Sequence, residues 1–119
     1  MKNAIRLILI MFFVMLISSC MPDRIKEEAN KEFGDQNFKA AIALIELHKT
    51  REGEYPETLD SLKYIGGFDK TILSSVKYRK LDTGYNLDLM RGWMGKPKDL
   101  KYPDDFWEGL RLVESNLKK

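Results

Sequence analysis

The chain has 119 residues, with 20 basic and 18 acidic side chains and one cysteine, Cys20. This length is enough for one domain with one modest core, and a single cysteine excludes an internal disulfide. If Lys2 and Arg6 are removed with the first apolar run, 18 side chains of each sign remain. A balanced chain exerts no long-range attraction on DNA, RNA or anionic lipid, so we expect no nucleic-acid partner.

The first segment has the layout of a secretory signal. Lys2 and Arg6 charge its start, residues 7–17 contain no polar side chain, and two small serines follow. As a helix, the apolar run would cover roughly 16 Å, about half of a hydrocarbon core of about 30 Å. A signal peptide over residues 1–19 is therefore a better prediction than a membrane-spanning anchor.

The end of this segment, "ISSC" at residues 17–20, resembles the lipobox of bacterial lipoproteins. In that family the cysteine is lipidated and becomes the first residue of the mature chain, which implies a diacylglyceryl thioether and an N-acyl chain on Cys20. More than one acyl chain is needed to hold a protein stably at a membrane. The alternative, a free thiol, is unusual in an oxidising compartment. Met21 stands where an aspartate would imply inner-membrane retention, so the resemblance implies the outer membrane.

The segment from residue 20 to residue 36 is rich in charge, which is also typical of a solvated tether. However, Ile25, Ala29 and Phe33 recur every four residues, and Asp23 can cap a helix that begins just after it. We therefore expect this lipid-anchored segment to be helical.

The strongest helical periodicity lies in "NFKAAIALIELHKTREG". Its predicted core stripe consists of Phe38, Ala41, Ile42, Ile45 and His48. Four further residues are predicted to widen that stripe: Ala40, Ala43, Leu44 and Leu47. Little but Lys39, Glu46, Lys49 and Thr50 would then face water. Because Gly53 supplies a stop, we expect one helix from about Asp23 to Arg51, with a bend at Gly34 left open, packed against a sheet.

A turn and a hairpin are predicted next. Pro56 is expected to start a short helical turn that ends at Gly66-Gly67, with Leu59 and Leu62 on one face.

The alternation in "SVKYRKLDTGYNLDLMRG" predicts a hairpin that turns at Asp82-Thr83-Gly84, where Gly84 is able to take the positive φ of a short bulged turn. In the tail, the sequence allows a short amphipathic helix from Pro103 onward.

This order of elements resembles the globular part of type IV pilins and type II secretion pseudopilins. The turn motif "G-x-YP-x-x-L-x-x-L" of that family is matched by Gly53, Tyr55, Pro56, Leu59 and Leu62. The resemblance implies an α+β domain over residues 37–119, with a long N-terminal helix on a small antiparallel sheet and a short C-terminal helix or irregular tail. Pilins have a cleavage glycine and a hydrophobic helix where this chain has a lipobox, so we do not expect pilin-type polymerisation.

Catalytic signals are weak in this sequence. His48 is the only histidine, and its place on the apolar stripe favours a structural role over that of a general base. No serine lies in a G-x-S-x-G motif, and no glycine-rich phosphate loop is present. We therefore expect neither enzymatic activity nor a cofactor.

Two clusters in the tail are candidate sites. Carboxylates that could gather around calcium are Asp99, Asp104, Asp105 and Glu108. Major pseudopilins, which this domain resembles, bind calcium on a loop near the C-terminal end of the domain. Asp104 and Asp105 are equally well explained as acidic residues in the first turn of a helix, where negative charge is stabilising. The second cluster is aromatic and comprises Trp93, Tyr102, Phe106 and Trp107. These rings either cover the sheet or bind an envelope protein, with Trp93 the expected anchor and Trp107 the expected core residue.

Two functional hypotheses follow. The first is a lipid-anchored interaction module of the cell envelope that binds another envelope protein, as an accessory to a secretion or pilus system. The second is a periplasm-facing lipoprotein that binds a small ligand or calcium through its tail. An exposed apolar patch would favour the first hypothesis, and a pocket with converging polar groups would favour the second.

Overall fold

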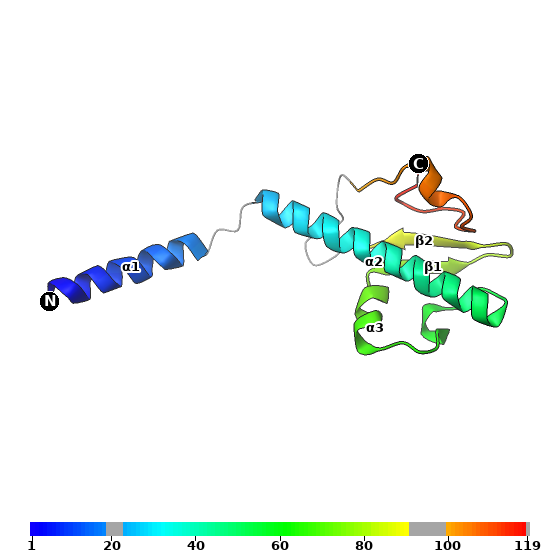
Figure 1. Cartoon of the computed structure of the whole chain (residues 1–119), viewed down its shortest axis with the longest axis horizontal. Coiled ribbons are helices and arrows are strands. Elements are labelled where there is room, and N and C mark those ends of the chain that lie inside the picture. Colours follow the sequence, from blue (N-terminus) through cyan, green and yellow to red (C-terminus); the bar gives the residue numbers. More distant parts are fainter. Residues whose placement is uncertain (19–22, 91–99, 119) are drawn as a thin grey trace.

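A computed structural model describes residues 1–18, 23–90 and 100–118. Its helices and strands are α1 (Lys2–Ser18), α2 (Asp23–Glu52), α3 (Gly67–Leu73), β1 (Val76–Lys80) and β2 (Tyr85–Leu89). Two short 3-10 turns cover Leu59–Ser61 and Asp104–Trp107. The prediction of an α+β chain with a long helix ahead of a small antiparallel sheet is confirmed (Figure 1).

Helix α2 is continuous through Gly34, and its 30 residues span about 45 Å. It ends where expected, because Gly53 takes a φ of +83°, which a glycine adopts without steric cost. The Gly53 N–H donates to the carbonyl of Lys49 at 2.9 Å, and the Lys49 ammonium donates to the Gly53 carbonyl at 2.7 Å.

The core forms between one face of α2 and the sheet. Four residues of the predicted stripe are buried: Phe38, Ala41, Ile42 and Ile45. The wider stripe was wrong at Ala43 and Leu47, which are exposed, whereas Ala40 and Leu44 are half-buried and Leu44 packs against the core. A sheet of two strands covers only one side of a helix, so the outer apolar residues keep their contact with water.

The segment between α2 and the hairpin differs from the prediction. The 3-10 turn begins at Leu59, three residues after Pro56. Gly66 and Gly67 do not end a turn but start helix α3, because Gly66 is the N-cap and the Asp69 carboxylate accepts its N–H at 2.9 Å. This hydrogen bond stabilises a helix start that hydrophobic spacing did not indicate.

The hairpin forms with Val76 opposite Leu89 and Lys80 opposite Tyr85. Gly84 does not use the positive φ open to a glycine, since the positive-φ glycines of the described chain are Gly53 and Gly109. The structure requires a glycine at position 84 for another reason. A Cβ at this buried position would clash with the backbone carbonyl of Arg111, which passes directly over the turn.

Of the two alternatives predicted for the tail, a short helix from Pro103 onward or an irregular segment, the structure has the irregular one. The tail makes one 3-10 turn, Asp104–Trp107, and reverses at Gly109 with a φ of +77°. The chain then runs parallel to β2: the Tyr85 N–H donates to the Arg111 carbonyl at 3.0 Å, and the Val113 N–H donates to the Tyr85 carbonyl at 2.8 Å. The tail therefore closes the outer edge of β2.

Candidate functional site

Three of the predicted site residues lie outside the described part of the chain. These are Cys20, the expected lipidation site, Trp93, the expected partner anchor, and Asp99, one of the expected calcium ligands. The predictions for these residues stand as they were derived from the sequence.

The described tail aromatics pack on the start of the core. The Tyr102 ring stacks on Phe106 at 4.0 Å between centroids and on Phe38 of α2 at 5.8 Å. Trp107 meets Phe38 edge-on at 6.1 Å. Tyr102, Phe106 and Trp107 are all half-buried, so each ring covers Phe38 or its neighbours while keeping part of its surface in contact with water.

A hydrogen bond fixes this aromatic cluster to α2. The Tyr102 hydroxyl donates to the Asp35 carboxylate at 2.9 Å, and Asp35 also pairs with Lys39 at 3.0 Å. Burial, together with this hydrogen bond, raises the pKa of Tyr102, so the hydroxyl stays protonated far above neutral pH. The tail is thereby held against the middle of α2.

The proposed calcium ligands in the described tail are not gathered into a site. Asp104, Asp105 and Glu108 are exposed, and Asp104 and Asp105 occupy the first turn of the 3-10 helix. No group of three His, Cys, Asp or Glu side chains suited to a metal occurs among the residues that the structure describes.

A carboxylate that the sequence had assigned to solvent is partly covered by the domain and hydrogen-bonded to two tyrosines. Glu46 is half-buried, and its carboxylate accepts hydrogen bonds from the hydroxyls of Tyr55 at 3.2 Å and Tyr85 at 3.0 Å. Burial and the charge of Glu46 raise the pKa of both tyrosines. The prediction that Glu46 faces water failed because helical spacing indicates only which face of the helix a residue occupies. It does not indicate that the hydroxyls of Tyr55 and Tyr85 would donate to the Glu46 carboxylate.

A third tyrosine completes this group. The Tyr78 hydroxyl donates to the Pro56 carbonyl at 2.6 Å, and its ring lies 5.7 Å from that of Tyr85. Burial and the charge of Glu57 raise the pKa of Tyr78 to about 12. With neutral hydroxyls donating to fixed acceptors, these tyrosines act as structural links between α2, the following turn and the sheet.

The outer face of α2 is exposed and mostly apolar, with Gln36 as an exposed polar residue near its centre. We use this name for the stripe formed by Ile25, Phe33, Ala43 and Leu47, which helical geometry places together on the side opposite the core. The exposed fractions are 52% for Ile25, 56% for Phe33 and 51% for Leu47. Single exposed apolar residues are common, whereas several on one helix face form a candidate contact surface.

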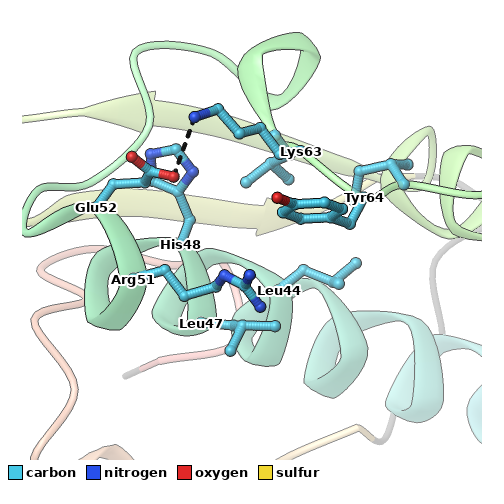
Figure 2. A pocket seen from close by; sticks show the side chains of 9 residues that line it. Leu44, Leu47, His48, Arg51, Glu52, Lys63 and Tyr64 are labelled. Carbon is cyan, nitrogen blue, oxygen red and sulfur yellow. Dashed lines mark hydrogen bonds and ion pairs between the residues drawn. The ribbon is translucent and has the colours of Figure 1, made fainter.

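A small hollow continues this face at the C-terminal end of α2 (Figure 2). Its walls include Leu47, His48 and Arg51 from the helix and Tyr64 from the following loop. Arg51 lies over the Tyr64 ring at 4.8 Å, and Tyr64 has a φ of +60°, which is uncommon for a residue with a side chain. The volume of about 60 Å³ is far below that of small-molecule pockets.

His48 is half-buried in the wall of this hollow. It lies one helical turn before Glu52, whose carboxylate pairs with Lys63 at 3.2 Å (Figure 2). The sequence had placed His48 on the core stripe; in the structure it lies at the margin of that stripe.

A larger groove lies between the 3-10 turn and α3. Its volume is about 520 Å³, and its lining comprises Leu59, Asp60, Leu62, Ile65, Lys70, Leu73 and Ser74. We call it the α3 groove. Sequence reasoning missed it because it depends on α3, a helix that was not predicted.

Comparison of the chain with protein-family models, with curated proteins and with solved structures finds no significant match. Among the described residues, no helix combines the length and the apolar character needed to cross a membrane.

Proposed function

We propose that the protein is a lipid-anchored, non-catalytic interaction module of the bacterial cell envelope, held at the outer membrane and facing the periplasm. The anchor is the lipidated Cys20 that the "ISSC" segment predicts. Anchoring at this residue places α2 directly after the membrane attachment point, because α2 begins at Asp23. A role as an accessory to a secretion or pilus system follows from the resemblance of residues 40–89 to pilins.

The outer face of α2 carries the proposal. The same helix has a second apolar face, which is filled by the core at Phe38 and Ile45, both fully buried. Phe33 and Leu47 on the outer face remain about half exposed. A helix that is apolar on both sides is expected in a protein that buries the second side against a partner.

The shape of this face favours another helix as the partner. Between Phe33 and Leu47 this side of the helix carries Gln36 and then two alanines, Ala40 and Ala43, which project little from the helix. Small residues allow the backbone of a second helix to approach closely, while the larger side chains at either end fill its grooves. The partner is therefore an envelope protein that presents an apolar helix.

Site-specific photo-cross-linking in intact cells tests this function. A photoreactive residue at Phe33 should give one discrete adduct with another envelope protein. The matched control is Lys31, which is also exposed but lies about 200° away around the helix, and it should give none. Cys20→Ser should abolish the Phe33 adduct, because the unanchored chain does not reach its partner. Equal adducts at both positions, or no adduct at Phe33, would contradict the proposal.

A small-ligand function is the second candidate, and the α3 groove is the observation that favours it. Its volume of about 520 Å³ lies within the range of small-molecule sites. Asp60, Lys70 and Ser74 would supply the polar contacts. Native mass spectrometry of the protein purified from membranes tests this candidate: a retained small molecule would support it, and a ligand-free mass would count against it.

A further inference from the structure

The hydrogen-bond pattern of the hairpin shows which backbone groups lie on the outer edge of β1. The Met90 N–H donates to the carbonyl of Ser75, the residue before β1, at 2.8 Å. Along an antiparallel strand, residues whose backbone N–H and C=O groups face the partner strand alternate with residues whose backbone groups face away from it. The backbone N–H and C=O groups of Val76, Tyr78 and Lys80 therefore point away from β2.

The corresponding groups of β2 are covered by the tail. Tyr85 and Leu87 form backbone hydrogen bonds with residues 111–114. The Asn116 side chain then bonds both backbone groups of Leu89, accepting its N–H at 2.9 Å and donating to its carbonyl at 2.8 Å. This edge of the sheet is closed along the length of β2.

The outer edge of β1 is open within the described chain. Among residues 1–18, 23–90 and 100–118, no hydrogen bond reaches the outward N–H or C=O groups of Val76, Tyr78 and Lys80. A row of unpaired backbone groups on an edge strand is a template for pairing with another strand.

The helical layer extends past this open edge. Helix α3 contacts α2, and Figure 1 shows α3 and the loop before it on the β1 side of the molecule. The α3 groove lies between these two segments, with Leu59, Leu62 and Leu73 in its walls. A strand added beside β1 would therefore find apolar side chains on the helical side of the sheet.

The other side of β1 is basic. The side chains of Lys77 and Arg79 lie on the face of the sheet opposite to those of Val76, Tyr78 and Lys80, and they are exposed. Charge therefore disfavours a second copy of β1 as the added strand, since antiparallel pairing about Tyr78 would set Lys77 beside the second copy's Arg79. Acidic side chains on an added strand would instead lie beside these two cations.

We propose that the open edge of β1 binds an extended segment of another protein in which apolar and acidic residues alternate. Its backbone pairs with Val76, Tyr78 and Lys80, its apolar side chains face the α3 groove, and its acidic side chains lie beside Lys77 and Arg79. This inference goes beyond the proposed function, which concerns the outer face of α2.

Amide hydrogen exchange by NMR on the full chain in detergent micelles tests the edge directly. In the free protein, the amides of Val76, Tyr78 and Lys80 should exchange rapidly, while those of Lys77 and Arg79, which pair with β2, should exchange slowly. A blocked nine-residue peptide of alternating valine and glutamate should slow exchange at the three outward amides. Slow exchange there before the peptide is added, or no protection after it, would overturn the proposal.

A charge exchange provides the matched control. The same peptide with lysine in place of glutamate should bind about tenfold more weakly, and Lys77→Glu with Arg79→Glu should reverse this preference. Equal binding of the two peptides, or spectral changes confined to the α3 groove, would contradict strand addition. These measurements need neither the lipid nor the partner of α2, so their failure would leave the Phe33 cross-linking result unaffected.

Discussion

At the residue scale, Glu46 links three parts of the domain. It is on α2, while the hydroxyls that donate to it belong to Tyr55 in the turn and Tyr85 in the sheet. Tyr85 is fully buried, so its hydroxyl has no access to water as a substitute acceptor. This arrangement makes one carboxylate important for both stability and tyrosine ionisation.

Glu46→Ala should destabilise the domain by about 1 to 3 kcal/mol, because it leaves a buried hydroxyl without its acceptor. The loss of the negative charge should also lower the pKa of Tyr55 and Tyr85 toward the ordinary value. Urea melts and ultraviolet tyrosine titrations measure the two effects. Glu28→Ala, on the exposed part of the same helix, should change stability by less than about 0.5 kcal/mol. If both variants behave alike, the role assigned to Glu46 is wrong.

Gly84 is the second residue whose identity the structure explains. Gly84→Ala should force the Arg111 backbone away from the turn and cost about 1 to 3 kcal/mol, as overpacked sites do. Gly67→Ala is the control, because an added Cβ there meets no atom within 4 Å. Thermal melts, with the NMR signal of the Val113 amide as a reporter of the tail, would distinguish them. An undisturbed Val113 signal in Gly84→Ala would refute the close approach.

At the scale of elements, the sequence predicted the helix and the hairpin that have a clear hydrophobic periodicity, and it missed the short helix α3, which has none. Helix α2 was predicted to within one residue at its C-terminus, because apolar spacing and Gly53 both indicate it. The hairpin was predicted from alternation. Helix α3 has only seven residues, and its start depends on the Asp69 contact rather than on hydrophobic spacing. Its omission also hid the α3 groove.

The tail shows a different limit of sequence reasoning. Its pairing with β2 is parallel and joins residues more than twenty positions apart, such as Tyr85 and Leu112. Alternation within one segment cannot indicate which strand it will join. Of the tail's candidate residues, the structure brings Tyr102 and Phe106 together, but neither Asp104 nor Asp105 joins a group of three potential metal ligands among the described residues.

The two faces of α2 make an element-scale prediction. Ile45→Ala should destabilise the domain by about 2 to 5 kcal/mol, since Ile45 is fully buried between the helix and the sheet. Leu47→Ala removes a residue that is 51% exposed and should cost less than about 0.5 kcal/mol. Chemical denaturation of the two variants compares them. Equal losses of stability would mean that the buried and outer faces of α2 are misassigned.

At the scale of the whole molecule, the raised tyrosine pKa values make stability depend on alkaline pH. The pKa of Tyr78 is about 12 in the folded protein and near 10 in an unfolded chain. Folding therefore favours the protonated hydroxyl. The resulting stability is complete below pH 10 and is lost as the pH rises toward 12.

Urea melts at pH 8, 10 and 11 should show this loss as a falling free energy of unfolding above pH 10. Tyr78→Phe should make the fall shallower, because one of the contributing hydroxyls is absent. Burial raises the pKa of Tyr55, Tyr85 and Tyr102 in the same direction, so part of the slope should remain. A free energy of unfolding that is the same at pH 8 and pH 11 would contradict these pKa directions.

The whole molecule combines a predicted membrane anchor with a domain that has an apolar outer face on α2. Attachment at Cys20 would place the start of α2 at the membrane and hold the outer face, from Ile25 to Leu47, in the periplasm. Binding of the proposed envelope partner to the outer face of α2 depends on that attachment.

Intact-mass measurement of the chain purified from the membrane fraction tests this central claim most directly. We predict a chain that begins at Cys20 and carries the added mass of a diacylglyceryl group and an N-acyl chain. In cells producing Cys20→Ser, the precursor should remain uncleaved and unacylated. A wild-type chain that retains residues 1–19, or that begins at Cys20 without added lipid mass, would contradict the account.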